Sequence, residues 1–240
     1  MIVLGIETST AHSSVALLVD GAVVAHEHHE EARGHGAFLA PAMRRCLDAV
    51  PGSDGVAHVD AVAVGTGPGL YTGLRVGMAT AAAFASARGV PVVGVGGMDA
   101  LAHAEVRDGA DVDGTGALVT TIDARRGQVF WAVHRTDGAG TVRVDGPRVG
   151  TRDELDAACA ELRTAGVVRI VGEVAGDGLR RPDAADTARL ALPVLAATPH
   201  GELAAERLVP VYLRDADVRI GWTERGGVRV GDGGAPGGAA

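Results

Sequence analysis

The segment Val62–Gly77, with the sequence VAVGTGPGLYTGLRVG, constrains the fold more than any other part of the chain. It begins within an apolar run that is typical of a buried strand. Three glycines and a proline then fall within residues 65–69, where they favour a tight turn. Thr72 is a candidate helix N-cap, and the helix is expected to continue over Gly73–Arg88. The segment therefore predicts a strand, a glycine-rich loop and a helix.

The predicted helix, GLRVGMATAAAFASA, is small or apolar nearly all the way round. A helix of this kind is buried on more than one side, and its small residues let a second helix approach closely. The loop before it has two interpretations, an anion site at the helix N-terminus or a tight turn packed against neighbouring backbone. The loop has no basic side chain, which favours the turn. The chain contains no Lys and position 70 is Leu, so neither G-x-x-x-x-G-K-[ST] nor G-x-G-x-x-G is present.

The composition limits the possible functions. The 240 residues suffice for one large domain or two small ones, and the net charge is −8. An acidic chain is not expected to hold a phosphate backbone unaided, so a basic partner would be needed for nucleic acid. Arg125–Arg126 and Arg180–Arg181 are expected to be solvated surface pairs. No apolar run of membrane-spanning length and no leader is evident, so a cytosolic protein is expected, with Cys46 and Cys159 in its core.

Hydrophobic periodicity predicts the remaining elements. In the first half, strands are expected over 2–6, 13–19, 22–29 and 91–95, helices over 36–50 and 98–106, and a polar hinge over 108–116. In the second half, strands are expected over 117–122, 128–135, 142–149 and 167–171, with a capping-box helix over 151–165. An irregular stretch covers 172–193, with one more strand near Leu190. A helix is expected from Thr198-Pro199 to Leu208, then extended chain over 209–213, and a disordered tail over 226–240.

The two halves share a pattern. Each has a strand, an acidic residue, a turn, a second strand and an Asp-Gly turn, with Glu7 and Asp123 in matching places. This indicates a duplicated unit and two related lobes around a hinge. Glu7, Thr8 and Ser9 end the first strand, where a phosphate or metal sits in several nucleotide-binding folds. The local alternative is a surface turn satisfied by its own hydroxyls.

Histidines suggest a metal site only weakly. His26 and His28 share one face of a strand, and His35 follows nearby. No carboxylate is obviously placed to complete a coordination shell, and the H-E-x-x-H pattern is absent. We therefore expect no metal and no cofactor, and an exposed hairpin end is the favoured interpretation of the histidines.

Three motifs, VGTGPGLYTGLRVG, TIDARRGQVFWAV and PVYLR, together resemble the TsaB (YeaZ) family over residues 1–219. The family consists of dimerisation subunits of the bacterial machinery that makes threonylcarbamoyladenosine in tRNA. The resemblance implies an α/β fold of the actin/Hsp70/sugar-kinase type with two ribonuclease-H-like lobes, here 1–108 and 109–225. It also implies a non-catalytic subunit that binds the catalytic relative TsaD, is joined by the ATPase TsaE, and meets tRNA only through the complex. Alone it would form a homodimer, and no membrane is involved.

The resemblance places the dimer contact on the two helices of the first lobe, which would pack with those of the partner as a four-helix bundle. The interface residues that it implies are Phe38, Pro41, Ala42, Arg45, Thr72, Gly73, Arg75, Val76, Ala79 and Ala82.

The sequence also departs from its relatives. TsaD-like enzymes carry an H-x-x-x-H pair, but here His35 is followed at position 39 by Leu. Glu7 stands where family members usually have Asp. These departures argue against metal-dependent chemistry. One alternative is an ATP-using enzyme of the sugar-kinase type, with Glu7, Thr8, Ser9 and Asp123 in a nucleotide cleft that is vestigial in the favoured interpretation. The other is a TsaD-like metalloprotein or peptidase.

Overall fold

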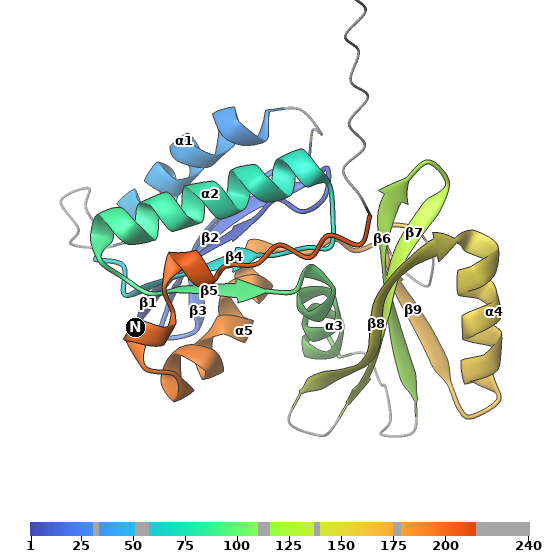
Figure 1. Ribbon diagram of the computed structural model, residues 1–240. Helices are drawn as coiled ribbons and strands as arrows, with labels where there is room; N and C mark the ends of the chain where they lie inside the picture. Colours follow the sequence, from blue (N-terminus) through green and yellow to red (C-terminus); the bar gives the residue numbers. More distant parts are fainter. Residues whose placement is uncertain (31–33, 51–57, 110–115, 137–139, 175–178, 215–240) are drawn as a thin grey trace, which may run out of the picture.

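The computed structural model describes residues 1–30, 34–50, 58–109, 116–136, 140–174 and 179–214. Two β-sheets lie next to each other, with helices on their faces (Figure 1). The first sheet has the strand order β3-β2-β1-β4-β5. Its strands are β1 (Ile2–Glu7), β2 (Ser13–Val19), β3 (Ala22–His29), β4 (Ala61–Gly65) and β5 (Val92–Val95). The central strand β1 is antiparallel to β2 and parallel to β4.

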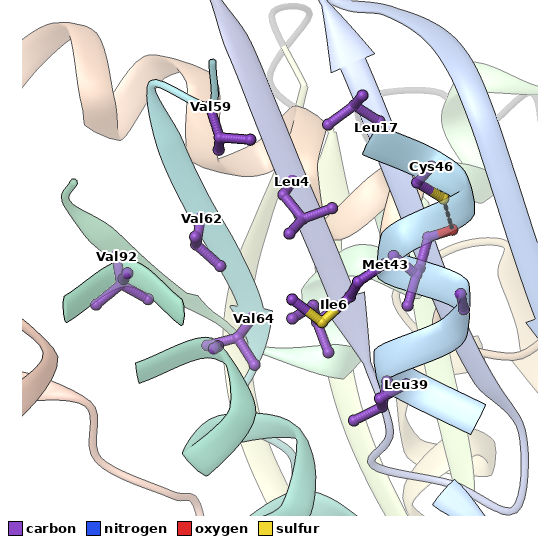
Figure 2. Close-up of a cluster of buried hydrophobic side chains, with 14 of the residues drawn as sticks. Leu4, Ile6, Leu17, Leu39, Met43, Cys46, Val59, Val62, Val64 and Val92 are labelled. Carbon is purple, nitrogen blue, oxygen red and sulfur yellow. Dashed lines mark hydrogen bonds between the residues drawn. The ribbon is translucent and has the colours of Figure 1, made fainter. Parts of the chain in front are cut away.

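Alternation of side chains along these strands creates two hydrophobic clusters, one on each face of the first sheet. On one face, Leu4, Ile6 and Val64 pack under α1 (His35–Asp48) and α2 (Tyr71–Arg88), as Figure 2 shows. The thiol of Cys46 lies in this cluster and donates to the carbonyl of Val15 at 3.7 Å. Burial raises its pKa to about 11, which confirms Cys46 as a core residue.

The second sheet has the order β8-β7-β6-β9. Its strands are β6 (Ala117–Arg125), β7 (Gln128–Thr136), β8 (Thr141–Thr151) and β9 (Val168–Gly172). The helix α4 (Arg152–Arg163) packs on one side, where Leu155 and Cys159 are buried with Val119 and Trp131. The predicted capping box opens this helix, because Thr151 accepts from the backbone of Glu154 and the Glu154 side chain accepts from the backbone of Thr151.

The two halves of the chain exchange helices. The helix α3 (Gly97–Arg107) follows β5 but contacts β6 and β8 of the second sheet. In return, α5 (Ala184–Ala197), from the second half, packs on β1, β2 and β4, with α3 and α5 in contact (Figure 1). Each sheet is thus covered in part by a helix from the other half of the chain, and the boundary between residues 108 and 109 stays a prediction.

Three details of the sequence interpretation are wrong. Residue 190 lies in the helix α5, where a strand was expected. The single helix expected up to Leu208 is instead two 3-10 turns, η1 (His200–Glu202) and η2 (Ala205–Arg207). Thr72 is not an N-cap, since α2 begins at Tyr71 after the extended residue Leu70.

The Asp137-Gly138 turn, most of the hinge and the tail lie outside the described residues. In the described part of the chain, no helix has the length and apolar character needed to cross a membrane.

Candidate functional site

The glycine-rich segment packs against the end of β1. Three positions leave no room for a side chain: an added Cβ at Gly65 would lie 2.0 Å from Oε2 of Glu7, and at Gly69 it would lie 2.0 Å from the carbonyl oxygen of Ser9. At Gly73 it would lie 2.4 Å from the carbonyl oxygen of Thr8. The backbone of Leu70 also donates to Ser9 at 2.6 Å. These contacts support the interpretation of the loop as a tight turn packed on neighbouring backbone.

The structure brings Glu7, Thr8 and Ser9 together, but it buries them. Their exposed fractions are 1%, 1% and 0%. Oε1 of Glu7 accepts from the backbone of Ser9 at 2.8 Å, and the hydroxyl of Thr8 donates to the carbonyl of Gly73 at 2.8 Å. Burial raises the pKa of Glu7, although hydrogen bonds from Ser9 oppose the shift. The group is an interior polar cluster, which is neither of the two local interpretations of the sequence.

Asp123 lies at the matching turn of the second sheet and is only partly buried. Its carboxylate accepts from the backbone of Arg125 at 2.8 Å and pairs with the guanidinium of the same residue at 3.0 Å. Its backbone donates to Glu173 at 3.1 Å, and burial raises the pKa of Glu173. Of the four residues assigned to a cleft, only Asp123 offers a carboxylate near solvent, and the nucleotide role of the set stays a prediction.

The histidines have structural partners. His26 bonds to Asp183 at 2.9 Å, and this hydrogen bond raises the pKa of His26. His35 bonds to the hydroxyl of Ser13, and burial lowers its pKa. Among the described residues, no group of three or more His, Cys, Asp or Glu side chains is arranged to hold a metal ion.

Most residues of the predicted interface lie on the outer surface of α1 and α2. Pro41, Arg45, Thr72, Arg75 and Ala79 are exposed, whereas Phe38, Val76 and Ala82 are half-buried. Ala42 and Gly73 are buried inside the protein. Those two residues do not contact solvent, because Ala42 lies in the core under α1 and Gly73 packs against Thr8. They can affect a partner only through the residues that cover them.

Arg75 is held against two tyrosines. Its guanidinium lies 3.8 Å from the centre of the Tyr71 ring and donates to the hydroxyl of Tyr212 at 2.8 Å. The two rings are 5.0 Å apart. A groove of about 550 Å³ opens beside this cluster, between the first turns of α1 and α2. It is lined by Gly34, His35, Gly36, Leu70, Tyr71, Thr72, Gly73 and Val76.

Sequence reasoning missed a second pocket of about 220 Å³ that three distant segments form. It lies where the glycine loop, the β6–β7 turn and residues 211–214 meet. Its polar and aromatic lining residues are Tyr71, Arg125, Arg126, Phe130, Tyr212 and Arg214. The backbone of Val211 donates to Thr66 at 2.8 Å, which holds the final segment beside the loop. No local sequence pattern predicts that these three segments form a pocket, although the PVYLR motif includes residues 211–214.

Comparisons with known proteins give the relationship. Residues 23–149 match the family model described as TsaD, tRNA N6-adenosine threonylcarbamoyltransferase. An uncharacterized protein of Mycobacterium leprae is 36% identical over 91% of this chain, which spans 56% of that relative's length. The tRNA threonylcarbamoyladenosine biosynthesis protein TsaB of Escherichia coli is 33% identical over 58% of each chain. The protein of that name from Bacillus subtilis is 28% identical over 93% of this chain and 99% of its own length.

A solved structure of YeaZ from Pseudomonas aeruginosa superimposes with a TM-score of 0.68 and 27% identity. The superposition covers 88% of this chain and 100% of that one. A second structure from the same organism, described as similar to peptidase YEAZ, gives 0.71 and 29% identity over 89% and 99% of the two chains. The expected α/β fold is thereby confirmed, and the chain belongs to the TsaB (YeaZ) family.

Proposed function

We propose that this protein is a non-catalytic, cytoplasmic subunit of the machinery that forms N6-threonylcarbamoyladenosine beside the anticodon of tRNA. It acts by dimerising with the catalytic subunit TsaD through the outer surface of α1 and α2. TsaE binds to that pair, and tRNA meets this chain only within the complex. Without TsaD, the chain pairs with a second copy of itself. The names of its relatives, TsaB proteins of threonylcarbamoyladenosine biosynthesis, support the pathway.

The observation that carries the proposal is the outer face of α2. Thr72, Ala79 and Ala83 are exposed and Val76 is half-buried, so the middle of the helix presents small uncharged side chains. Arg75, the one charge in that stretch, is folded back onto Tyr71 and Tyr212. Small residues let helix backbones approach closely, which suits a helix packed against a helix of a partner. The groove at the first turns of α1 and α2 adjoins this face, and it offers a depression that a side chain of the partner can fill.

The end of β1 supports the proposal that this subunit is not catalytic. Glu7, Thr8 and Ser9 are enclosed by the glycine loop and bonded to the protein itself. A phosphate or metal ion reaching them would have to displace the first turn of α2. We therefore assign the catalytic chemistry to the partner subunit.

The interface is tested by placing a carboxylate in the middle of the α2 face. Val76→Glu and Ala79→Glu are expected to weaken the complex with cognate TsaD at least tenfold, because association would bury an unpaired charge. Affinity is measured by titration, and the mass of each mixture by light scattering. Ala160→Glu is the matched control, since Ala160 is an exposed alanine on the unrelated helix α4.

The controls separate the possible outcomes. Each variant is first checked for an unchanged thermal midpoint, so that a folding defect is not mistaken for lost binding. A wild-type complex that persists with both α2 variants would overturn the interface assignment. Loss of binding with Ala160→Glu as well would show that the effect of charge is not specific to α2.

A further inference from the structure

A third pocket, of about 340 Å³, lies on the opposite face of the first sheet, where β3, α3 and α5 meet. Four arginines line it, Arg107, Arg180, Arg181 and Arg189, together with His26 and only two carboxylates, Asp183 and Asp186. Among the lining residues, the arginines thus outnumber the carboxylates, although the chain as a whole has a net charge of −8. This volume leaves space for a polyatomic anion.

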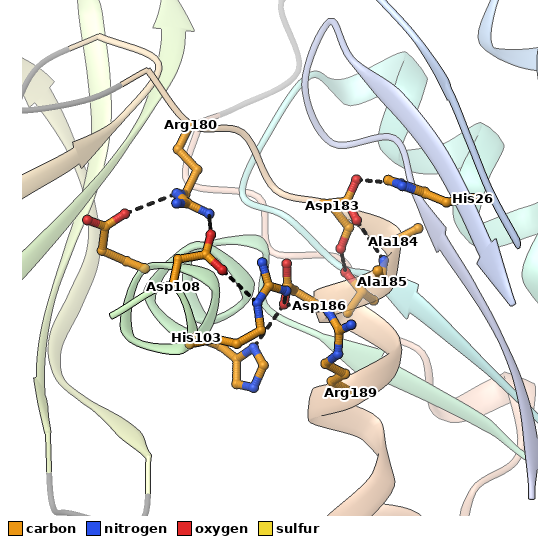
Figure 3. A network of polar contacts seen from close by, with 12 residues as sticks. His26, His103, Asp108, Arg180, Asp183, Ala184, Ala185, Asp186 and Arg189 are labelled. Carbon is orange, nitrogen blue, oxygen red and sulfur yellow. Dashed lines mark hydrogen bonds and ion pairs between the residues drawn. The ribbon is translucent and has the colours of Figure 1, made fainter. Parts of the chain in front are cut away.

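The arginines are held in place by carboxylates behind them. Asp186 is buried in the first turn of α5, and its Oδ1 alone receives Arg107, Arg189 at 3.3 Å and His103 at 3.0 Å. Figure 3 shows His103 and Arg189 converging on this residue. One oxygen of one carboxylate therefore serves two guanidinium groups and an imidazole nitrogen. Arg107 has a second partner, because its Nε donates to Asp108 at 2.9 Å.

Arg180 and Arg181 complete the positive rim from the segment before α5. Arg180 pairs with Glu105 at 3.0 Å and with Asp108 at 2.8 Å, using its Nε and Nη1 atoms. Among the described residues, the partners of Arg181 are distant, Glu173 at 3.5 Å and Glu30 at 3.8 Å. Its Nε is buried without a hydrogen-bond partner among the described residues. The two residues were expected to be a solvated surface pair; they are partly exposed, at 28% and 33%, but both also form ion pairs.

The guanidinium groups remain accessible. The four arginine side chains are 25–35% exposed, so they are fixed by their pairs but still reach the pocket. Their contacts with the described residues include Nε and Nη1 atoms. Guanidinium groups held in fixed orientations match the geometry of phosphate oxygens better than flexible ammonium groups do.

We propose that this pocket binds a phosphate group, held by Arg107, Arg181 and Arg189. It lies on the sheet face opposite α1 and α2, so it would stay open when TsaD is bound there. Two sources offer this chemistry, the backbone of an RNA and a free phosphate compound. Phosphate binding by this pocket does not depend on the proposed function. The assignment of RNA as the source of the phosphate rests on the proposed function.

The test is calorimetric titration of the full-length chain with inorganic phosphate, against sodium chloride of equal ionic strength. Phosphate is expected to bind the wild-type protein, and both Arg181→Gln and Arg189→Gln are expected to weaken binding about tenfold. Arg181→Lys should restore part of it. Arg148→Gln is the matched control, because Arg148 is an exposed arginine that pairs with Asp145 outside the pocket. Thermal midpoints of all variants establish that they fold.

The outcomes separate clearly. Equal heats for phosphate and chloride, or phosphate affinity unchanged in both pocket variants, would overturn the proposal. A second titration, of cognate tRNA into the complex with TsaD, identifies the source. If the phosphate belongs to RNA, Arg189→Gln should reduce the slope of log affinity against log salt by roughly 0.7–0.9. If tRNA affinity and slope are unchanged while phosphate binding is lost, the site serves a free phosphate compound.

Discussion

The ends of β1 and β6 carry the same strand–acid–turn pattern, but the protein treats them differently. Glu7, at the end of β1, is 1% exposed and bonded to Ser9, whereas Asp123, on β6, is partly exposed and paired with Arg125. A glycine ends the neighbouring parallel strand in both sheets: Gly65 lies against Glu7, and Gly172 lies against Thr121. The acids and strand glycines are therefore shared, and they do not explain the difference.

The difference comes from the segment after the neighbouring strand. After β4, the glycine loop leads directly into α2, and Gly69, Gly73 and Gly77 let this segment press onto Thr8 and Ser9. After β9, the chain runs instead to α5, which crosses to the first sheet. At the end of β6, Met98 and Leu101 of α3 pack with Ile122 and Ala124, and Asp123 stays partly exposed. A duplicated pattern thus yields one sealed end and one partly open end, because the glycines of the loop and of α2 pack directly onto Thr8 and Ser9 at the first end.

The largest expected effect on stability comes from adding a methyl group to the glycines that pack on the end of β1. Gly69→Ala and Gly73→Ala would each place a Cβ 2.0–2.4 Å from a backbone oxygen. Each should cost about 3 kcal/mol, since backbone on both sides leaves little room to relax. At 2–4 °C per kcal/mol, the thermal midpoint should fall by roughly 6–12 °C.

The matched control for those variants is Gly36→Ala on α1. Gly36 has no atom near an added Cβ, so alanine should leave stability unchanged or raise it by up to about 1 kcal/mol. Similar midpoints for Gly36→Ala and Gly69→Ala would contradict the close packing described for the loop.

Removing charge from the two acids sharpens the comparison. The raised pKa of Glu7 means that the folded protein favours the protonated side chain, so ionisation costs stability as pH rises above the unfolded value of about 4.3. Relative to wild type, Glu7→Gln should therefore gain stability between pH 5 and pH 8. Asp123→Asn removes one partly exposed pair and should change stability by no more than about 0.5 kcal/mol. Midpoints measured across that pH range test both, and a Glu7→Gln variant that loses stability relative to wild type as pH rises would contradict the account.

The smallest expected effect concerns α5, which reaches the sealed end through Thr187 and Glu7, 3.4 Å apart. Asp183 caps this helix and bonds to His26, whose raised pKa gives stabilisation that is fully present below the unfolded value of about 6.5. That stabilisation is lost as pH rises through the folded value. His26→Gln should thus cost roughly 0.5 kcal/mol at pH 5.5 and less at pH 8.5. His58→Gln, at a more exposed histidine paired with Asp60, is the control. A cost for His26→Gln that grows with pH would reverse the assigned sign.

The sequence predicted the parts of the fold that depend on local pattern. Apolar runs bounded by turns placed β1 to β7 correctly, and Thr151 with Glu154 announced α4. The helix α5 was missed because LALPVLAA is apolar on several sides and contains Pro193, which conceals helical periodicity. Its exchange with α3 could not be predicted, since it depends on contacts between segments far apart in the chain.

The candidate sites show the same limit. The TsaB resemblance assigned an interface to α1 and α2, which stays a prediction, and it could not reveal that Ala42 and Gly73 are buried there. The resemblance also did not show that Glu7, Thr8 and Ser9 are enclosed by α2. The pocket of four arginines was missed because its members come from α3, α5 and the segment between β9 and α5. Sequence reasoning saw only the adjacent pair Arg180–Arg181.

The central claim is that this chain supports threonylcarbamoyladenosine formation as a binding partner and not as a catalyst. The most direct measurement is the amount of the modified nucleoside formed on tRNA by cognate TsaD and TsaE, with and without this chain. We expect modification only when the chain is present, with Glu7→Gln as active as wild type and Ala79→Glu inactive. Full modification without the chain, or loss of activity in Glu7→Gln while the TsaD complex persists, would contradict the account.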